Sequence, residues 1–273
     1  MQETIVTHLT PKSPVSEAFR NMRTNVLFSD IDNERKVLAI TSSGGSEGKS
    51  TILANYGVTL CQSGKRVLIV DCDLRKPQIH RRFELNNATG LTNLLLKEIK
   101  TVDAFQRTEV PNLFAIVAGP IPPNPSEILA SRRMAEIITE LKLHFDYILL
   151  DTPPLGMVTD AAVLSPVVDG YIVLASLGAV HRDGLLHVLD TFAKINAHVV
   201  GIVANKVPVS KRFSKYGYYS AYGYYGNEDI SNKKTKKEKV KKEKKKWGKG
   251  IAKTSIEQTI EKHPEAASVE QKI

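Results

Sequence analysis

A glycine-rich segment that ends in lysine, serine and threonine carries the clearest chemical signal in the sequence. It follows the apolar run 37–41 and precedes a segment of helical period. Glycines permit a tight turn whose N–H groups point at phosphate, and a helix start adds its positive dipole end. Here Lys49 would reach the β- and γ-phosphates, and Ser50 would bind Mg²⁺. The predicted nucleotide-binding residues are Gly44, Gly45, Ser46, Glu47, Gly48, Lys49, Ser50 and Thr51.

The loop departs from the usual phosphate-loop spacing at one place, where Ser43 stands instead of the first glycine. Glycine at that place is a conformational preference and not a reacting group, so the departure weighs little. The alternative is a purely structural glycine-rich turn. The strand–loop–helix context favours the phosphate loop.

Three aspartates follow two further apolar runs. Asp71 and Asp73 come after the run 67–70, and Asp151 comes after the run 147–150. Residues i and i+2 of an extended chain point the same way, and ligands of open α/β sheets bind beyond the carboxyl ends of the strands. One such aspartate alone is often a helix cap. Three around one phosphate loop predict catalytic residues Lys49, Asp71, Asp73 and Asp151, and metal ligands Ser50, Asp71, Asp73 and Asp151.

Short apolar runs alternating with longer helical patterns predict the elements that position these residues. Runs that are apolar on both faces and separated by longer segments are typical of parallel strands covered by helices. The expected strands are 37–41, 67–70, 113–117, 147–150, 171–174 and 199–203, and the expected helices are 49–63, 126–144 and 181–196. The sequence therefore predicts a doubly wound α/β domain over 37–210.

An N-terminal segment, 1–36, is expected to be helical. Ser13 followed by Pro14 signals a helix start, and apolar residues then recur three and four apart at Val15, Phe19, Met22 and Val26. Glu17, Arg20 and Arg23 lie three apart on a different stripe. Taken alone, that stripe is most simply a solvated charged face with a weak ion pair.

The sequence pattern changes after residue 210. Residues 211–228 hold a cluster of six of the nine tyrosines, Tyr216, Tyr218, Tyr219, Tyr222, Tyr224 and Tyr225. Residues 229–273 are lysine-rich, and 211–273 as a whole carry the entire net charge of +9. This composition predicts a disordered tail, with a weak helical pattern at 251–262.

Composition excludes several classes of protein. At 42% hydrophobic residues the chain is not disordered throughout, and two cysteines, Cys61 and Cys72, exclude a disulfide-stapled fold. The longest apolar stretches are interrupted by Pro166 and Asp169, and residues 1–30 contain no signal-peptide core. We therefore expect a cytoplasmic protein.

Three motifs together make the sequence resemble the bacterial tyrosine kinases over about residues 5–226. They are the phosphate loop, the stretch LIVDCDLR at 68–75 and the stretch ILLDTPP at 148–154, which correspond to the Walker A, A′ and B motifs of that family. The tyrosine cluster, the loop at 122–127 and the Glu17, Arg20 and Arg23 helix, the family's oligomerisation motif, are also similar. The resemblance implies a P-loop NTPase fold of the MinD-like type and ATP-dependent, Mg²⁺-assisted phosphorylation of tyrosine.

The resemblance also implies partners. The chain is similar to the split form of these kinases, which regulates capsular or exopolysaccharide synthesis together with a separate transmembrane activator that has a cytoplasmic tail. It implies a ring-like homo-oligomer, protein tyrosine substrates and a phosphotyrosine phosphatase. It implies autophosphorylation in trans on the tyrosine cluster, and recruitment to the inner face of the cell membrane.

The expected chemistry leaves some roles open. A carboxylate near the γ-phosphate should accept the tyrosine proton, and the sequence does not choose between Asp73 and Asp71. Arg75 could stabilise the transferred charge or form an ordinary ion pair. The tyrosine cluster could instead be a stacking or adhesive patch. The lysine-rich tail could bind an anionic membrane surface until phosphorylation weakens it, or could only aid solubility.

Two other classes of protein compete with the kinase. A partitioning or division-site switch ATPase shares the fold but usually has a second lysine after the first loop glycine, where this chain has Gly44. A nucleic-acid-binding protein would suit the lysine run. However, Trp247 is the only aromatic residue in that run, which contains no arginine, so stacking and bidentate base readout have little to work with.

Overall fold

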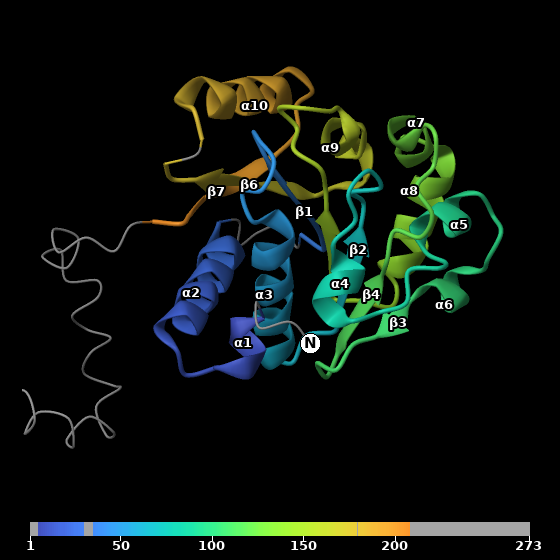
Figure 1. The fold of residues 1–273 in the computed structure, drawn as a ribbon, viewed down its shortest axis with the longest axis horizontal. Coiled ribbons are helices and arrows are strands. Elements are labelled where there is room, and N and C mark those ends of the chain that lie inside the picture. The colour runs from blue at the N-terminus through green and yellow to red at the C-terminus, as the bar shows by residue number, and fades with distance from the viewer. Residues whose placement is uncertain (1–4, 30–34, 179, 208–273) are drawn as a thin grey trace, which may run out of the picture. The chain divides into compact units, whose positions relative to one another are not determined.

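A seven-stranded, mostly parallel sheet forms the centre of the structure (Figure 1). The computed structural model describes residues 5–29, 35–178 and 180–207. The strand order is β3-β4-β2-β5-β1-β6-β7, and β3 alone runs antiparallel to its neighbour β4. The strands are β1 (Val37–Ser42), β2 (Val67–Asp71), β3 (Gln106–Arg107), β4 (Leu113–Ile116), β5 (Tyr147–Asp151), β6 (Gly170–Ser176) and β7 (Val199–Asn205).

The central strands are buried on both faces, which explains their unbroken apolar runs. Along β5, Ile148 and Leu150 belong to one core and Leu149 to the other. This alternation is the two-residue period of an extended chain. A strand segment whose side chains enter two cores must be apolar at successive positions. Burial on both faces therefore explains the continuous apolar runs in the sequence.

Four helices cover one face of the sheet: α1 (Val6–Leu9), α2 (Pro14–Phe28), α3 (Lys49–Gln62) and α4 (Ile79–Phe83) (Figure 1). Ser13 caps α2 by accepting a hydrogen bond from the Ser16 N–H at 3.1 Å, as the sequence predicts. Thr7 N–H donates to the Asn55 side chain at 3.0 Å, which ties α1 to α3. The N-terminal helices are thus part of the same compact unit as the sheet.

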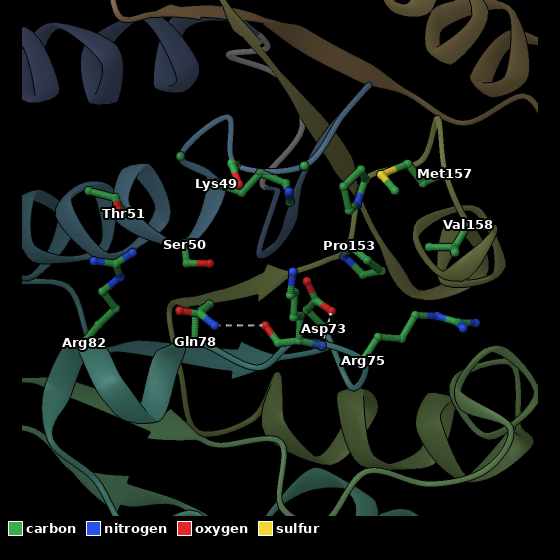
Figure 2. Close-up of a pocket in the computed structure, with 15 residues that line it drawn as sticks. Lys49, Ser50, Thr51, Asp73, Arg75, Gln78, Arg82, Pro153, Met157 and Val158 are labelled. Atoms are coloured by element: carbon green, nitrogen blue, oxygen red, sulfur yellow. Dashed lines mark hydrogen bonds between the residues drawn. The ribbon is translucent and has the colours of Figure 1, made fainter. Parts of the chain in front are cut away.

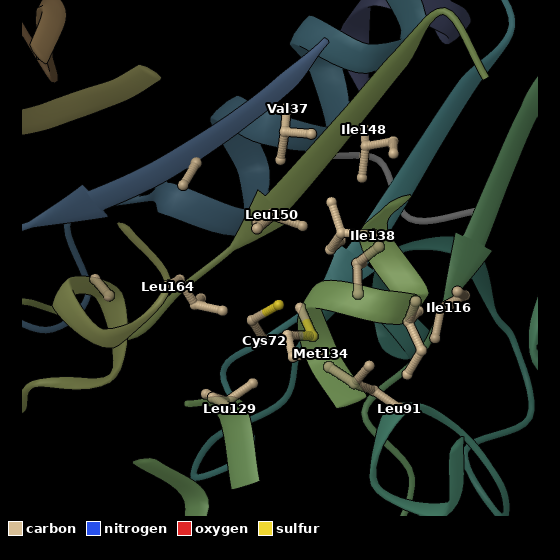
Figure 3. Close-up of a cluster of buried hydrophobic side chains, with 14 of the residues drawn as sticks. Val37, Cys72, Leu91, Ile116, Leu129, Met134, Ile138, Ile148, Leu150 and Leu164 are labelled. Carbon is tan, nitrogen blue, oxygen red and sulfur yellow. The ribbon is translucent and has the colours of Figure 1, made fainter. Parts of the chain in front are cut away.

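The opposite face is covered by α5 (Leu91–Leu95), α6 (Thr101–Ala104), α7 (Pro125–Leu129), α8 (Arg132–Leu141), α9 (Asp160–Val163), the 3₁₀ turn η1 (Ser165–Val167) and α10 (Arg182–Lys194). Apolar residues of these elements, such as Met134 and Ile138, pack against Val37, Ile148 and Leu150 of the strands, as does Leu164 between α9 and η1 (Figure 3). The sheet therefore has helices on both faces, as expected for a doubly wound fold.

The six predicted strands are confirmed within two residues at each end, and two helical predictions need correction. The predicted helix 126–144 is two helices, α7 and α8, because Ser131 adopts an extended conformation and caps the second. Val15 is 53% exposed and does not join the apolar face of α2, whereas Phe19 is buried at 8%. The hydrophobic periodicity therefore predicts whether a segment is a helix or a strand better than it predicts where a helix is interrupted.

Several sequence predictions fall outside the described residues. The tyrosine cluster at 211–228, the lysine-rich segment at 229–273 and the weak helical pattern at 251–262 are among them. Within the described ranges, no helix has both the length and the apolar character that crossing a bilayer requires.

Candidate active site

The phosphate loop joins β1 to α3, as the sequence predicts. Gly48 has φ +104° and Ser46 has φ +60°, so the chain turns through the left-handed region just before the helix. The positive φ of residue 48 favours glycine. A Cβ there would lie 2.6 Å from Nδ2 of Asn205, so any other residue would also displace the Asn205 side chain. The turn places the start of the fourteen-residue helix α3 at the cavity. This is the arrangement of an anion-binding helix start.

Glu47 holds the base of the loop with its buried carboxylate, which is only 2% exposed. Oε1 accepts hydrogen bonds from the Gly44 N–H at 2.6 Å and from the Ser43 hydroxyl at 3.1 Å. Oε2 accepts one from the Ser176 N–H at 3.0 Å, at the end of β6. The Glu47 carboxylate and the Gly44 N–H therefore support the loop's own structure, and the Glu47 backbone N–H takes no part in these contacts. Both residues were predicted to bind nucleotide, and neither is among the residues that line the cavity.

Lys49 is the buried cation of the site, with 8% of its surface exposed. Its Nζ donates to the Ser42 hydroxyl at 3.3 Å. Burial lowers the pKa of Lys49, while the nearby charges of Asp151, Asp73 and Glu47 act in the opposite direction. An ammonium group held among carboxylates at a phosphate loop is suited to the charge of a nucleotide's phosphates.

Asp71 and Asp151 are directly opposite each other at the ends of the paired strands β2 and β5. Asp71 is fully buried, and its Oδ2 accepts hydrogen bonds from the N–H groups of Gln78 at 3.0 Å and Ile79 at 2.9 Å. Burial, followed by the charge of Asp151, raises the pKa of Asp71 well above its ordinary value. Because Asp71 anchors the start of α4, its contacts here are structural.

Asp151 is buried at 1% exposure, and neither of its carboxylate oxygens has a hydrogen-bond partner among the described residues. Burial raises its pKa to about 7, while the nearby Ser50 hydroxyl and the Lys49 ammonium act to lower it. Ser50 approaches Asp151 without reaching the geometry of a hydrogen bond. Two buried oxygens without donors, beside a hydroxyl, suit Mg²⁺, which takes oxygen ligands and keeps several waters.

A cavity of about 590 Å³ opens at these strand ends. The loop side contributes Gly45, Ser46, Gly48, Lys49, Ser50 and Thr51, and the opposite side contributes Asp73 (Figure 2). Asp73 lies in the loop after β2, where its Oδ1 accepts a hydrogen bond from the Lys76 N–H at 2.9 Å. Asp73 therefore lines the cavity, whereas Asp71 does not.

Further residues of the cavity were not predicted from sequence: Lys76, Gln78, Arg82, Pro153, Pro154, Met157 and Val158. Gln78 directly precedes α4 and Arg82 lies within it, four residues later, which is about one helical turn. Had α4 been predicted, that spacing would have pointed to them. The charge of Arg82 also acts to lower the pKa of Asp151.

Arg75 lines the cavity and is held by an ion pair. Its Nε and one terminal nitrogen bind the two oxygens of Asp160 at 2.8 and 3.0 Å. The Asp160 side chain is completely buried, and Ser126 also hydrogen-bonds to it. Ser126 belongs to α7, in the 122–127 stretch. Of the two roles left open for Arg75, the ion pair thus has a definite partner, in a network that joins the loop after β2 to α7 and α9.

The predicted oligomerisation residues make contacts within the chain. Arg20 Nε donates to Glu17 at 2.6 Å, and a terminal nitrogen of Arg23 donates to the Thr59 carbonyl oxygen at 2.5 Å. The Arg23 contact joins α2 to α3. The six predicted acceptor tyrosines lie outside the described residues.

A mostly parallel sheet with a phosphate loop after β1 and aspartates at the ends of β2 and β5 defines a P-loop NTPase fold. The AAA domain model matches residues 35–204. CapB of Staphylococcus aureus is 42% identical over 212 residues, 78% of this chain and 93% of CapB. The tyrosine-protein kinase YwqD of Bacillus subtilis is 39% identical, over 80% of this chain and 92% of YwqD.

A solved structure of the same kind aligns over most of the described residues. The crystal structure of the chimerical protein CapA2B2 superposes with a TM-score of 0.73 at 36% identity, covering 76% of this chain and 92% of that one. These relatives extend over nearly their whole length in the alignments. The chain belongs to the family of bacterial tyrosine-protein kinases.

Proposed function

We propose that this chain is an ATP-dependent protein-tyrosine autokinase that phosphorylates its own C-terminal tyrosine cluster. The carrying observation is the cavity whose walls bring Lys49 and Ser50 of the phosphate loop to face Asp73 across one space. Phosphoryl transfer requires positioning and neutralisation of charge far more than covalent help from the protein. A cavity with a cation and a helix start on one side and a carboxylate on the other meets that requirement.

In the proposed reaction, the amides of the loop and Lys49 hold the phosphates, with Thr51 near the α-phosphate. Mg²⁺, bound by Ser50 and Asp151 directly or through water, would neutralise charge on the β- and γ-phosphates. The tyrosine oxygen forms a bond to the γ-phosphorus as the bond to the β–γ bridging oxygen breaks, and ADP leaves. Asp73 accepts the phenol proton. Of the two aspartates left open by the sequence, Asp73 is the better base because it lines the cavity.

We further propose that the acceptors are presented between subunits. A ring joined through Glu17, Arg20 and Arg23 would bring one subunit's tyrosine cluster to the cavity of the next. Tyr216 lies only ten residues after Lys206, and ten extended residues span at most roughly 33–36 Å. Mixing a Lys49→Met chain with a chain whose six tail tyrosines are phenylalanine separates the routes. Phosphotyrosine on the Lys49→Met chain requires transfer in trans.

A separate membrane protein with a cytoplasmic tail is the proposed activator, and capsular or exopolysaccharide synthesis the proposed process. The chain would then act in the cytoplasm at the inner face of the membrane, opposed by a phosphotyrosine phosphatase. Met157, 69% exposed, and Val158 form an apolar edge of the cavity that suits contact with such a tail. Other protein tyrosines are proposed as further substrates.

The lysine-rich tail supports a further proposal about location. Six phosphotyrosines would add roughly −9 to −12 charges, comparable with the +9 of the chain beyond residue 210. Autophosphorylation would then release the tail from an anionic membrane surface. Co-sedimentation with phosphatidylserine vesicles tests this, with the phosphorylated protein expected to stay in solution. Equal sedimentation of both forms contradicts the proposal.

The test of the main proposal is incubation with Mg·ATP, with and without a candidate activator tail, followed by mapping of phosphotyrosine. We expect modification in the tyrosine cluster, and none in the Lys49→Met variant. ATP hydrolysis without tyrosine modification, even with the activator, would instead favour the switch ATPase of the same fold. The observation that favours the kinase over that ATPase is Gly44, which stands where those ATPases carry a second lysine.

A further inference from the structure

Two side chains at the C-terminal end of β7, Asn205 and Lys206, donate hydrogen bonds to backbone carbonyl oxygens of the phosphate loop. Nδ2 of Asn205 donates to the carbonyl oxygen of Glu47 at 2.8 Å. Nζ of Lys206 donates to the carbonyl oxygen of Ser46 at 3.1 Å. These contacts join positions about 160 residues apart in the chain. They hold consecutive peptide groups of the loop that also lines the cavity.

Peptide planarity gives these contacts a directional consequence. In a trans peptide the C=O of one residue and the N–H of the next point in opposite directions. The described residues contain no cis peptide bond. When Lys206 holds the Ser46 oxygen, the Glu47 N–H is therefore directed away from β7. Asn205 fixes the Gly48 N–H in the same way through the Glu47 oxygen.

The strand order puts β7 and the opposite wall of the cavity on different sides of β1, the strand that leads into the loop. In the sheet, β6 and β7 lie on one side of β1, while β5 and β2 lie on the other. The cavity wall opposite the loop comes from the segments that follow β2 and β5, among them Asp73 and Pro153 (Figure 2). The loop thus lies between β7 and the cavity.

The local backbone is shaped for this contact. Lys206 has φ +54°, a left-handed conformation that costs a lysine about 1 kcal/mol or more, so its surroundings must hold it there. Oδ1 of Asn205 accepts the Lys206 N–H at 2.9 Å, which supports this turn. Gly48 completes the fit, since a Cβ there would overlap Nδ2 of Asn205 at 2.6 Å.

We propose that Asn205 and Lys206 are positioning residues that preset the loop amides of Glu47 and Gly48 to receive the phosphates of the nucleotide. The proposal deepens the function proposed above and rests on it. Asn205 has the larger part, because it is half-buried and its hydrogen bond is shorter, whereas Lys206 is exposed. Neither residue needs to touch the nucleotide for this role.

The experiment compares binding of ATP and of inorganic tripolyphosphate, which has phosphates but no base, to the full-length chain by calorimetry. We expect Asn205→Asp, which cannot donate to the Glu47 oxygen, to weaken both ligands about tenfold, equivalent to 1.4 kcal/mol. We expect Lys206→Met to weaken both about threefold and Lys206→Arg to restore them. The matched controls are Lys194→Met, at the exposed last residue of α10, and Asn196→Asp, at an exposed position after it. Both should bind ATP and tripolyphosphate as the unaltered chain does.

Three outcomes overturn the proposal. If Asn205→Asp weakens ATP but not tripolyphosphate, Asn205 acts on the base and not on the loop. Unchanged binding of both ligands by both variants removes the positioning role. A thermal midpoint is measured for each variant, and if the folded Lys206→Met variant binds normally while only its midpoint falls, the contact is merely structural. If the unaltered chain fails to bind ATP, the proposed function itself fails, which is a separate result.

Discussion

Replacing Arg75 by glutamine tests whether this residue acts on the reaction or on the fold. Arg75 makes two charge-assisted hydrogen bonds to Asp160, whose side chain is 0% exposed while that of Arg75 is 42% exposed. Removing one partner of a buried ion pair costs about 3–5 kcal/mol. Because solvent reaches Arg75, we reduce the expected loss of unfolding free energy to about 2–3 kcal/mol. For a domain of this size that lowers the melting temperature by roughly 4–12 °C.

The assay is urea unfolding followed by circular dichroism, on Arg75→Gln, Asp160→Asn and the double variant. We expect a coupling free energy of about 1–3 kcal/mol between the two residues, since they are in direct contact. Phosphotyrosine formation is measured below the transition on the same samples. The reasoning is refuted if Arg75→Gln unfolds within about 0.5 kcal/mol of the unaltered chain while its activity collapses. In that case Arg75 acts on the transferred group.

Further predictions concern four titratable groups, Lys49, Asp71, Asp73 and Cys61. Lys49→Met should abolish tyrosine phosphorylation on an immunoblot without lowering the melting temperature, because burial of the ammonium already disfavours its charge; a large drop in that temperature would contradict this. Asp71→Ala should lower the free energy of unfolding, measured in urea, by about 1–3 kcal/mol, because two amides at the start of α4 lose their acceptor. Asp73→Ala should instead mainly slow phosphoryl transfer, by about 10²–10⁴-fold in a rate assay. Burial raises the pKa of Cys61 to about 12 from 9.0, so its thiol should resist Ellman's reagent at pH 8 until the chain is unfolded. The stability that the buried thiol contributes should be lost as pH rises from 9 through 12. Rapid labelling of the folded chain would contradict the raised pKa.

The elements that carry the site could be predicted because their signals are local. Before their polar last residues, the strands β1, β2 and β5 are continuous apolar runs, which follows from burial on both faces. The loop before α3 has its glycines and lysine at fixed spacing. Helices such as α4 and α9 span only five and four residues. That is too short for a helical period to appear, so the Arg82 side of the cavity could not be predicted.

The different positions of Asp71 and Asp73 show where sequence reasoning stops. Alternation along a strand predicts that both point the same way, but β2 ends at Asp71 and the chain then turns. Asp71 is consequently enclosed by the start of α4, while Asp73 reaches the cavity. Likewise, the partners of Glu47 include Ser176 and Asn205, more than a hundred residues away. No local pattern contains such contacts.

The strand order has a consequence for how the chain is made. β1 is bordered by β5 and β6, so Val37 pairs with Ile148 and Leu38 with Gly170. When the phosphate loop leaves the ribosome, neither neighbour of its strand has been synthesised. A fragment that stops before β5 leaves two consecutive apolar strands without the one that separates them. Such unpaired edges promote aggregation. Translation therefore has to pass residue 176 before this segment is sheltered on both sides, a long interval in which chaperones would be of use.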